Sequence, residues 1–301
     1  MSLDPKHLAA LAEILRLGSF EAAADSLGLT QSAVSQRLKA LEDSFGSVLV
    51  ERASPCRGTA AGLRLAAHAD AVALMEANLA RTLGLDDQAT ESPRRIRLAV
   101  NADSLATWLP AALDSSAQYS FELLVDDESV SADRLRRGEV MAALTTQAKP
   151  VRGCDVVALG ALRYVATASP GFLRRWLALG PTPEALAQAP MLQFSAHDDL
   201  QHNWLAQHVR PGLRPPVHLV PSTTGFLGAT VAGLGWSLNP LGLAAPYLAE
   251  GKLVALLPNS HYDRPLYWQV SRIVSPALSQ ITARLRRHAK KALEPLGGQR
   301  L

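Results

Sequence analysis

Apolar residues recur at helical spacing in three stretches near the start of the chain, and they predict helices over residues 5–17, 20–27 and 31–45. Ser19 and Thr30 precede the second and third of these, where a hydroxyl can accept a hydrogen bond from a free backbone N–H. The pattern therefore predicts a small helical unit with a buried centre. Its apolar faces consist of Leu8, Leu11 and Leu15, then Phe20, Ala23, Ala24 and Leu27, then Val34, Leu38, Leu41 and Phe45.

The other face of the third helix carries amide and hydroxyl side chains and only one full charge. Glutamine can pair with the major-groove edge of adenine, serine can bind a base or a phosphate, and lysine can reach a phosphate or guanine. Two helices joined by a tight turn are typical of a helix-turn-helix, which places its second helix in the major groove. An ordinary helical hairpin with a solvated face is the alternative. The predicted DNA-binding residues are Thr30, Gln31, Ser32, Ser35, Gln36 and Lys39.

A short hairpin is expected directly after this unit. Residues 48–50 are an apolar strand, and Ser54, Pro55 and Gly58 mark a turn. Such a wing can lay Arg52 and Arg57 against the DNA backbone or in the minor groove.

Residues 59–83 predict one long helix that is rich in alanine and contains no proline. An apolar stripe on a helix outside a compact domain needs a partner, and a second copy of the chain is the simplest one. A helix packed on its own domain is the alternative. The stripe consists of Leu65, Ala69, Val72, Met75, Leu79 and Leu83. Residues 84–95 are polar and contain proline, and they indicate a hinge.

From residue 96 onward, apolar strands alternate with helical segments, which favours parallel sheets with crossover helices. Two such sets predict two α/β lobes with a cleft between them, and the last strand and helix are expected to return to the first lobe. The expected strands are 96–100, 121–125, 140–145, 156–158, 164–168, 191–194, 218–220, 237–239 and 266–271. The expected helices, beyond a strand-to-helix segment that starts at Asn101, are 132–138, 171–179, 200–208, 223–232 and 276–293.

Ligands of α/β sheets bind at the carboxyl ends of strands, beside helix N-termini. Two strand-to-helix junctions and two acidic clusters lie at such places, and carboxylates there would hold the cation of a small zwitterion. Plain N-capping and solvated loop acids are the alternatives. The candidate effector-binding residues are Asn101, Asp103, Ser104, Asp126, Phe194, Asp198, Asp199, Thr223 and Thr224.

Composition narrows the class of protein. The 301 residues are 48% hydrophobic and 19% charged, which suits two or three globular domains. The two cysteines, Cys56 and Cys154, have no metal-ligand spacing. No signal-peptide pattern or long apolar run appears, so a cytoplasmic protein without a membrane partner is expected. The net charge is +3, but residues 1–64 are neutral, so charge alone does not predict DNA binding.

No nucleophile elbow, phosphate-binding loop or HExxH motif occurs in the chain. Gly233-Leu234-Gly235 follows a predicted helix rather than a strand, so it does not indicate a dinucleotide site. We therefore expect neither an enzyme nor a cofactor, and no metal site.

The run AAADSLGLTQSAVSQRLKALEDSFGSVLVER resembles the N-terminal signature of the LysR-type transcriptional regulators, with several motifs in the family's order. The resemblance implies that the arginine at position 52 contacts DNA and that the long helix dimerises. It also implies a homodimer or homotetramer, with RNA polymerase as a further candidate partner.

The runs VNADSLATWLPAAL, FSAHDDLQHNWL and RPLYWQ are similar to the ArgP/LysG branch of that family, whose members sense lysine or arginine. This resemblance implies that Asp103, Ser104 and one of Asp198 and Asp199 lie near the effector. It also implies control of genes for export or metabolism of basic amino acids. A LysR-type regulator of a different small effector, and a small-molecule sensor that does not bind DNA, are the alternatives.

The expected fold is an α/β multidomain protein with three parts. Residues 1–60 form a winged helix-turn-helix that binds double-stranded DNA, and residues 61–91 form the linker helix and hinge. Residues 92–301 form a two-lobed effector domain like that of periplasmic binding proteins. Its expected lobe I combines 92–162 with 265–301, and its lobe II is 163–264.

Overall fold

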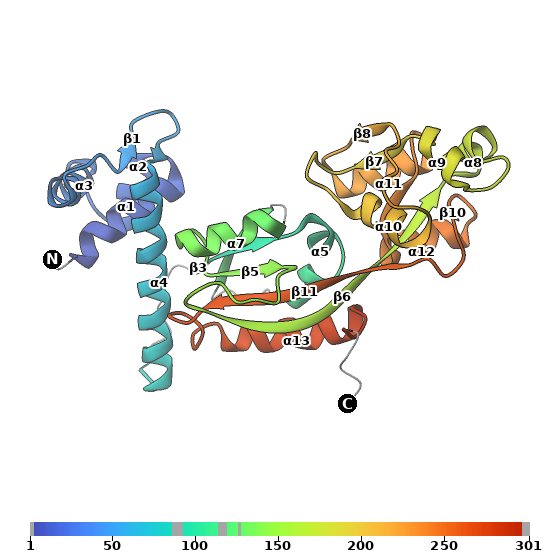
Figure 1. Ribbon diagram of the computed structural model, residues 1–301. Helices are drawn as coiled ribbons and strands as arrows, with labels where there is room; N and C mark the ends of the chain where they lie inside the picture. Colours follow the sequence, from blue (N-terminus) through green and yellow to red (C-terminus); the bar gives the residue numbers. More distant parts are fainter. Residues whose placement is uncertain (1–2, 86–92, 114–118, 126–127, 297–301) are drawn as a thin grey trace.

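The computed structural model describes residues 3–85, 93–113, 119–125 and 128–296, and it has three parts (Figure 1). A helical head is joined by one long helix to a two-lobed α/β unit. No helix in these ranges is both long and apolar enough to cross a membrane.

The head consists of three helices and a small hairpin: α1 (Pro5–Leu17), α2 (Phe20–Leu27), α3 (Gln31–Phe45), β1 (Val50–Glu51) and β2 (Arg57–Gly58). The predicted caps are present, since Ser19 accepts a hydrogen bond from Ala22 N and Thr30 accepts one from Ala33 N. The antiparallel hairpin pairs Val50 with Gly58. A winged helix-turn-helix is therefore confirmed.

Two details of the head differ from the expectation. Phe45 was expected in the buried stripe, but it is 37% exposed, because α3 ends there and its last turn extends past the core formed by Val34, Leu38 and Leu41. Val48 was expected in a strand, but it is 63% exposed and precedes the two-residue strand β1.

The long helix α4 (Ala60–Thr82) begins at the cap Thr59 and packs on both neighbours of its own chain. Gly62 lies so close to the carbonyl oxygen of Leu49 that a Cβ would clash with it, which fixes the helix against the head. Leu65 and Ala69 pack on the core of the head, whereas Leu74 is buried in the core of the α/β unit. The N-terminal part of the expected apolar stripe therefore packs against other parts of the same chain. Leu79 and Leu83 remain 58% and 60% exposed.

Lobe I contains a mixed sheet with helices on both faces (Figure 1). Strands β3 (Arg94–Val100), β4 (Tyr119–Val125) and β5 (Ala142–Thr145) run parallel. Helix α13 (Ser279–Ala292) lies along one face of the sheet and α7 (Glu128–Arg137) lies on the other. Two short helices, α5 (Ala102–Ala106) and α6 (Leu109–Ala112), follow β3.

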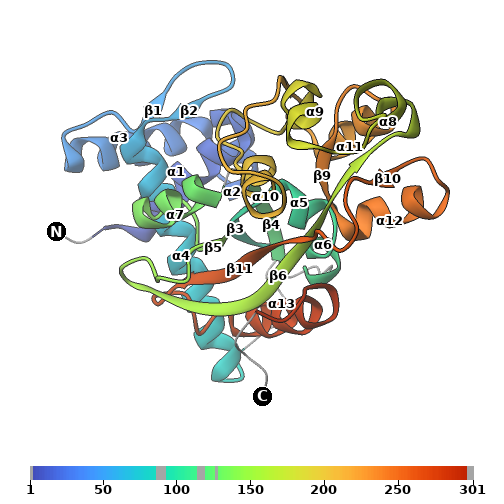
Figure 2. The same cartoon turned by 45° about the vertical axis from the view of Figure 1, so that its right-hand side comes forward.

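Two long antiparallel strands, β6 (Cys154–Ala168) and β11 (Tyr262–Ser271), connect the lobes (Figure 2). The expectation of two separate strands, 156–158 and 164–168, is wrong, because β6 is continuous through Gly160. This glycine has φ +138°, and a Cβ there would meet Glu294 O at 2.8 Å. Only glycine fits here without strain.

Lobe II contains the remaining strands and helices. Strands β7 (Met191–Gln193) and β8 (Val217–Leu219) form a parallel pair. Strands β9 (Ser237–Pro240) and β10 (Val254–Ala255) each pair antiparallel with β6. The helices are α8 (Pro170–Trp176), α9 (Pro183–Gln188), α10 (Leu200–His208), α11 (Thr223–Val231) and α12 (Leu241–Ala249). Of these, α9 and α12 were not expected, because α9 is only six residues long and α12 contains Pro246.

Candidate functional site

The recognition face of α3 is solvent-exposed. Val34, Leu38 and Leu41 of α3 are buried, whereas Gln31, Ser32, Gln36 and Lys39 are exposed and Ser35 is half-buried. Thr30 is also exposed, but its hydroxyl caps the helix, so it orients the first turn. A row of amide and hydroxyl groups on a helix packed by its other face suits insertion into a major groove.

The wing places Arg52 beside the helix-turn-helix. Its guanidinium carbon lies 5.2 Å from the centroid of the Phe20 ring, at the start of α2, and the residue is exposed. This stacking contact restricts the long side chain without neutralising its charge, so the cation stays available for phosphate. Arg57 is exposed on β2.

A cleft of about 540 Å³ lies between the two lobes of the α/β unit. Its walls come from the ends of β3, β5 and β7, the starts of α10 and α11, and the connecting strands β6 and β11, as expected for a ligand site at strand ends. The lining residues are Asn101, Ala102, Asp103, Val125, Thr146, Gln147, Tyr164, Phe194, Ser195, His197, Asp198, Asp199, Leu200, Gln201, Pro221, Thr223, Phe226, Leu238, Asn239, Pro240 and Arg264.

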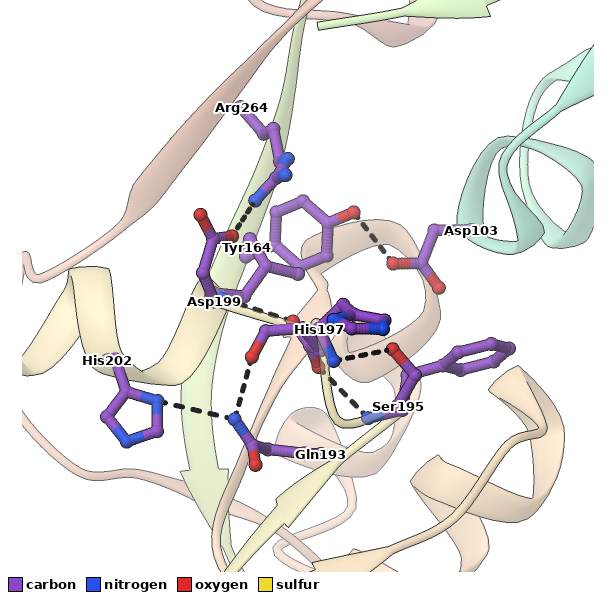
Figure 3. A network of polar contacts seen from close by, with 11 residues as sticks. Asp103, Tyr164, Gln193, Ser195, His197, Asp199, His202 and Arg264 are labelled. Carbon is purple, nitrogen blue, oxygen red and sulfur yellow. Dashed lines mark hydrogen bonds and ion pairs between the residues drawn. The ribbon is translucent and has the colours of Figure 1, made fainter. Parts of the chain in front are cut away.

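Asp103 joins the lobes across this cleft. Its carboxylate accepts hydrogen bonds from the Tyr164 hydroxyl at 2.7 Å and from the Thr223 hydroxyl at 3.2 Å. Asp103 comes from α5 of lobe I and Thr223 from α11 of lobe II, so one carboxylate contacts both lobes. Figure 3 shows the contact with Tyr164.

Asp198 and Asp199 are adjacent in sequence but lie in different environments. Asp198 accepts hydrogen bonds from the backbone N–H groups of Phe194 at 3.0 Å and Leu200 at 3.1 Å. Burial nevertheless raises its pKa above the ordinary value, because these bonds offset only part of the cost of desolvating the charge.

Asp199 forms an ion pair with Arg264 of β11 at 2.7 Å (Figure 3). Partial burial raises the pKa of Asp199, but the hydrogen bond and positive charge of Arg264 outweigh burial and lower it overall. The cleft therefore presents a positive group next to a negative one on its lobe II side.

The charges that line the cleft have an acidic excess. Among the described lining residues, three carboxylates, Asp103, Asp198 and Asp199, face one arginine, Arg264, together with His197. In the described part of the chain, no group of three metal-ligating side chains comes together. This charge balance suits a small organic cation that also carries an anionic group.

The candidate effector residues divide by position. Asp103, Phe194, Asp198, Asp199 and Thr223 line the cleft, and so does Asn101, whose buried side chain caps α5 by accepting from Ser104 N. Asp126 lies outside the described residues.

Two candidates do not line the cleft. The Ser104 hydroxyl is fully buried and accepts a hydrogen bond from the Trp108 indole at 3.2 Å. Thr224 is exposed on the first turn of α11 and does not line the cleft. Successive residues of a helix point about 100° apart, so Thr223 faces the cleft while its neighbour does not.

Several lining residues were missed by sequence reasoning. Tyr164, Arg264 and Gln201 lie within a strand or a helix, where the pattern of apolar residues gave no sign that they face a ligand. Arg264 falls in the run RPLYWQ, which was used only for its resemblance to the family branch.

Comparisons with known proteins agree with both parts of the structure. Residues 5–63 match the family model of the bacterial regulatory helix-turn-helix proteins of the lysR family. Residues 89–290 match the LysR substrate binding domain, which covers more than half of the chain.

Similar proteins at 36–44% identity include regulators named LysG and ArgP. The chain is 44% identical to the transcriptional regulator LysG of Mycobacterium bovis, over 94% of this chain and 93% of that protein. The crystal structure of ArgP from Mycobacterium tuberculosis has a TM-score of 0.77 and 42% identity, covering 98% of this chain and 100% of that one.

A third similar protein has a ligand in its structure. Full-length LysG of Corynebacterium glutamicum with its bound effector Arg has a TM-score of 0.65 and 36% identity, covering 97% of this chain and 100% of that one. The predicted resemblance to the ArgP/LysG branch is confirmed. The chain therefore belongs to the LysR family of bacterial helix-turn-helix transcriptional regulators, which are DNA-binding proteins rather than enzymes.

Proposed function

We propose that this regulator senses a basic amino acid, lysine or arginine, in the cleft between its lobes, and that binding changes how it holds promoter DNA. The observation that carries the proposal is the acidic excess of the cleft, where Asp103, Asp198 and Asp199 face Arg264. The effector Arg in the LysG structure of Corynebacterium glutamicum supports the same class of ligand.

The effector lies across the cleft in this proposal. The Arg264–Asp199 pair on the lobe II side offers a cation for the α-carboxylate and an anion for the α-ammonium group. On the lobe I side, the carboxylate of Asp103 binds the side-chain cation. This carboxylate already accepts hydrogen bonds from the Tyr164 and Thr223 hydroxyls. Charge-assisted hydrogen bonds of this kind are among the stronger polar contacts in proteins.

Binding shifts the distribution between open and closed lobes, because only a closed cleft contacts both ends of the ligand. The head is coupled to lobe I by α4, which packs on the core of each. A change in the lobes therefore alters the placement of the DNA-binding heads in a homodimer or homotetramer. The target genes are those for export or metabolism of the amino acid, and contact with RNA polymerase is a further expectation.

The family matches over residues 5–63 and 89–290 support the division into a DNA-binding domain, 1–60, a linker, 61–91, and an effector domain, 92–301. The course of β6 and β11 supports the change of lobe near residues 162 and 264. Binding to chromosomal DNA places the protein's action in the cytoplasm.

Footprinting of the DNA upstream of the protein's own gene, with and without lysine or arginine, tests the proposal. We expect a protected region whose extent or pattern of cleavage changes when the amino acid is added. Protection that is the same with and without every basic amino acid would remove the sensing role and leave DNA binding intact. No protection at any concentration would contradict DNA recognition at this site.

A further inference from the structure

Gln201, the second residue of α10, is a polar side chain in the wall of the cleft that has no hydrogen-bond partner among the described residues. The residue has no exposed surface, and neither its amide oxygen nor its amide nitrogen has a hydrogen-bond partner among the residues that the structure describes. It nevertheless lines the cleft. Because Gln201 lines the cleft without exposed surface, a ligand can reach its amide only once neighbouring side chains shift.

The other buried amides of the described chain are all bonded. Asn101 accepts from Ser104 N, and Gln193 donates to the carbonyl oxygen of Asp198. The two remaining ones, Asn239 and Gln269, donate to Thr167 and Ser237, and to Thr145, Gln147 and Lys149, respectively. Gln201 is thus the exception among five buried amides. Burying an amide without a partner costs free energy, so such a residue calls for an explanation.

The surroundings of Gln201 indicate which ligand group can form hydrogen bonds with its amide. Asp198 and Asp199 directly precede α10, and Asp199 pairs with Arg264 at 2.7 Å. An amide has both a donor and an acceptor. A guanidinium or side-chain ammonium group carries donors only and would leave the amide N–H₂ unmatched. The α-ammonium and α-carboxylate of an amino acid supply a donor and an acceptor side by side.

We propose that Gln201 binds the α-ammonium and α-carboxylate head of the effector and thereby selects amino acids over diamines. The proposal rests on the proposed function, and it assigns the lobe II end of the cleft to the head group. In this assignment, Gln201 is a specificity-determining residue that binds the part of the ligand common to all amino acids. The carboxylates of the cleft bind the positive charge of the side chain.

The test is a calorimetric titration of the full-length protein with lysine and arginine, using the variants Gln201→Met and Gln207→Met. Methionine keeps the volume of glutamine and removes both polar atoms. Gln207 is exposed on the same helix and serves as the matched control. The diamine cadaverine, which is lysine without its carboxylate, is compared through the shift in melting temperature that it causes in each protein.

We expect Gln201→Met to weaken lysine and arginine binding by about 10- to 100-fold, the usual effect of losing hydrogen bonds to charged groups. The melting temperature of the ligand-free variant should be unchanged or higher. The shift in melting temperature caused by cadaverine, whatever its size, should be the same in Gln201→Met and in the unsubstituted protein. Gln207→Met should behave as the unsubstituted protein.

Unchanged affinity for lysine and arginine in Gln201→Met would overturn the proposal. A lower melting temperature with unchanged affinity would identify Gln201 as a structural residue held by an internal water. An equal loss for cadaverine and lysine would show that the amide does not read the head group. If the unsubstituted protein binds neither lysine nor arginine, the proposed function itself fails and this inference fails with it.

Discussion

In the proposed function, ligand binding depends most directly on Asp103. It receives hydroxyl hydrogen bonds from β6 and from α11, and both come from neutral donors. The Asp103 carboxylate lines the cleft, so a cation bound there can pair with it.

Replacing Asp103 by Asn keeps the shape and the ability to accept from Tyr164 but removes the charge. We expect lysine and arginine to bind about 10- to 100-fold more weakly, since a charge-assisted contact becomes a neutral one. Calorimetry measures the effect. Thr224→Ala is the control, because Thr224 is exposed beside the cleft-lining Thr223 without lining the cleft itself. Equal affinities for Asp103→Asn and the unsubstituted protein would contradict this assignment.

A second carboxylate, Asp70 of α4, makes the stability of the fold depend on pH. It lies 3.9 Å from Arg97 of β3, and its buried Oδ2 has no hydrogen-bond partner in the described chain. Burial raises its pKa to about 6, although Arg97 and Arg95 favour the charged form, and Glu122 and Glu13 oppose it.

The sign of the pH effect follows from this shift. Between the ordinary value of 3.8 and about 6, the folded chain holds a proton that the unfolded chain has released. The contribution of Asp70 to the free energy of unfolding therefore falls as pH rises through this range, by about 2–3 kcal/mol in all.

Replacing Asp70 by Asn should remove this fall and raise stability at pH 7.5 by up to the same amount. Arg97 keeps Glu122 as its partner at 2.9 Å. Denaturant titrations at pH 4.5 and pH 7.5 measure the difference, with the exposed Asp133→Asn as the control. An identical pH dependence in Asp70→Asn and the unsubstituted protein would show that Asp70 does not titrate in this range.

Among the elements, we expect α3 to carry the contact with DNA. Its exposed amides and hydroxyls lie opposite a buried face, so the helix can enter a major groove without disturbing the core of the head.

The double change of Gln31 and Ser35 to alanine should weaken binding to the protein's own promoter by about 10-fold or more, since base contacts contribute about 1–3 kcal/mol each. Its effect on unrelated DNA should be small. Lys39→Ala should weaken binding to all sequences alike and reduce its salt dependence, as expected for a phosphate contact. Fluorescence anisotropy with promoter and unrelated DNA separates the two. Unchanged promoter affinity in the double variant would contradict the assignment of α3 as the recognition helix.

Near the C-terminal end of α4, two apolar side chains are not covered by the part of the chain that the structure describes. Leu79 and Leu83 are mostly exposed, whereas Leu74 one turn earlier is buried. Changing both exposed leucines to glutamate should shift the protein toward smaller assemblies in analytical ultracentrifugation, because charges would enter an apolar contact between copies. The same change at Leu179, which is 95% exposed far from α4, is the control. An unaltered assembly would place the interface elsewhere.

Local patterns in the sequence predicted the elements of the head well, because caps, turns and apolar spacing act over a few residues. The continuous strand β6 was not predicted, since Gly160 normally indicates a break and is needed here for close approach to Glu294. The acids of the cleft were found from their position after strands. Tyr164 and Arg264 were not, because only the pairing of β6 with β11 brings them to the cleft.

Across the whole molecule, we expect the binding of a positive side chain in the cleft to be transmitted to the DNA-binding head by α4, which packs on the core of each. The two lobes are joined by β6 and β11 and by the contacts of Asp103 with Tyr164 and Thr223. A ligand shifts the equilibrium between open and closed lobes only as far as its affinities for the two arrangements differ.

Calorimetric titration of the full-length protein with lysine, arginine and norleucine measures whether the cleft recognises a positively charged side chain. Norleucine keeps the amino-acid head and a similar apolar chain but has no side-chain cation. We expect lysine or arginine to bind, and norleucine to bind at least about 10-fold more weakly than the tighter of the two, because Asp103 would lose its charged partner. Equal affinity for norleucine, or no binding of either basic amino acid, would contradict the account.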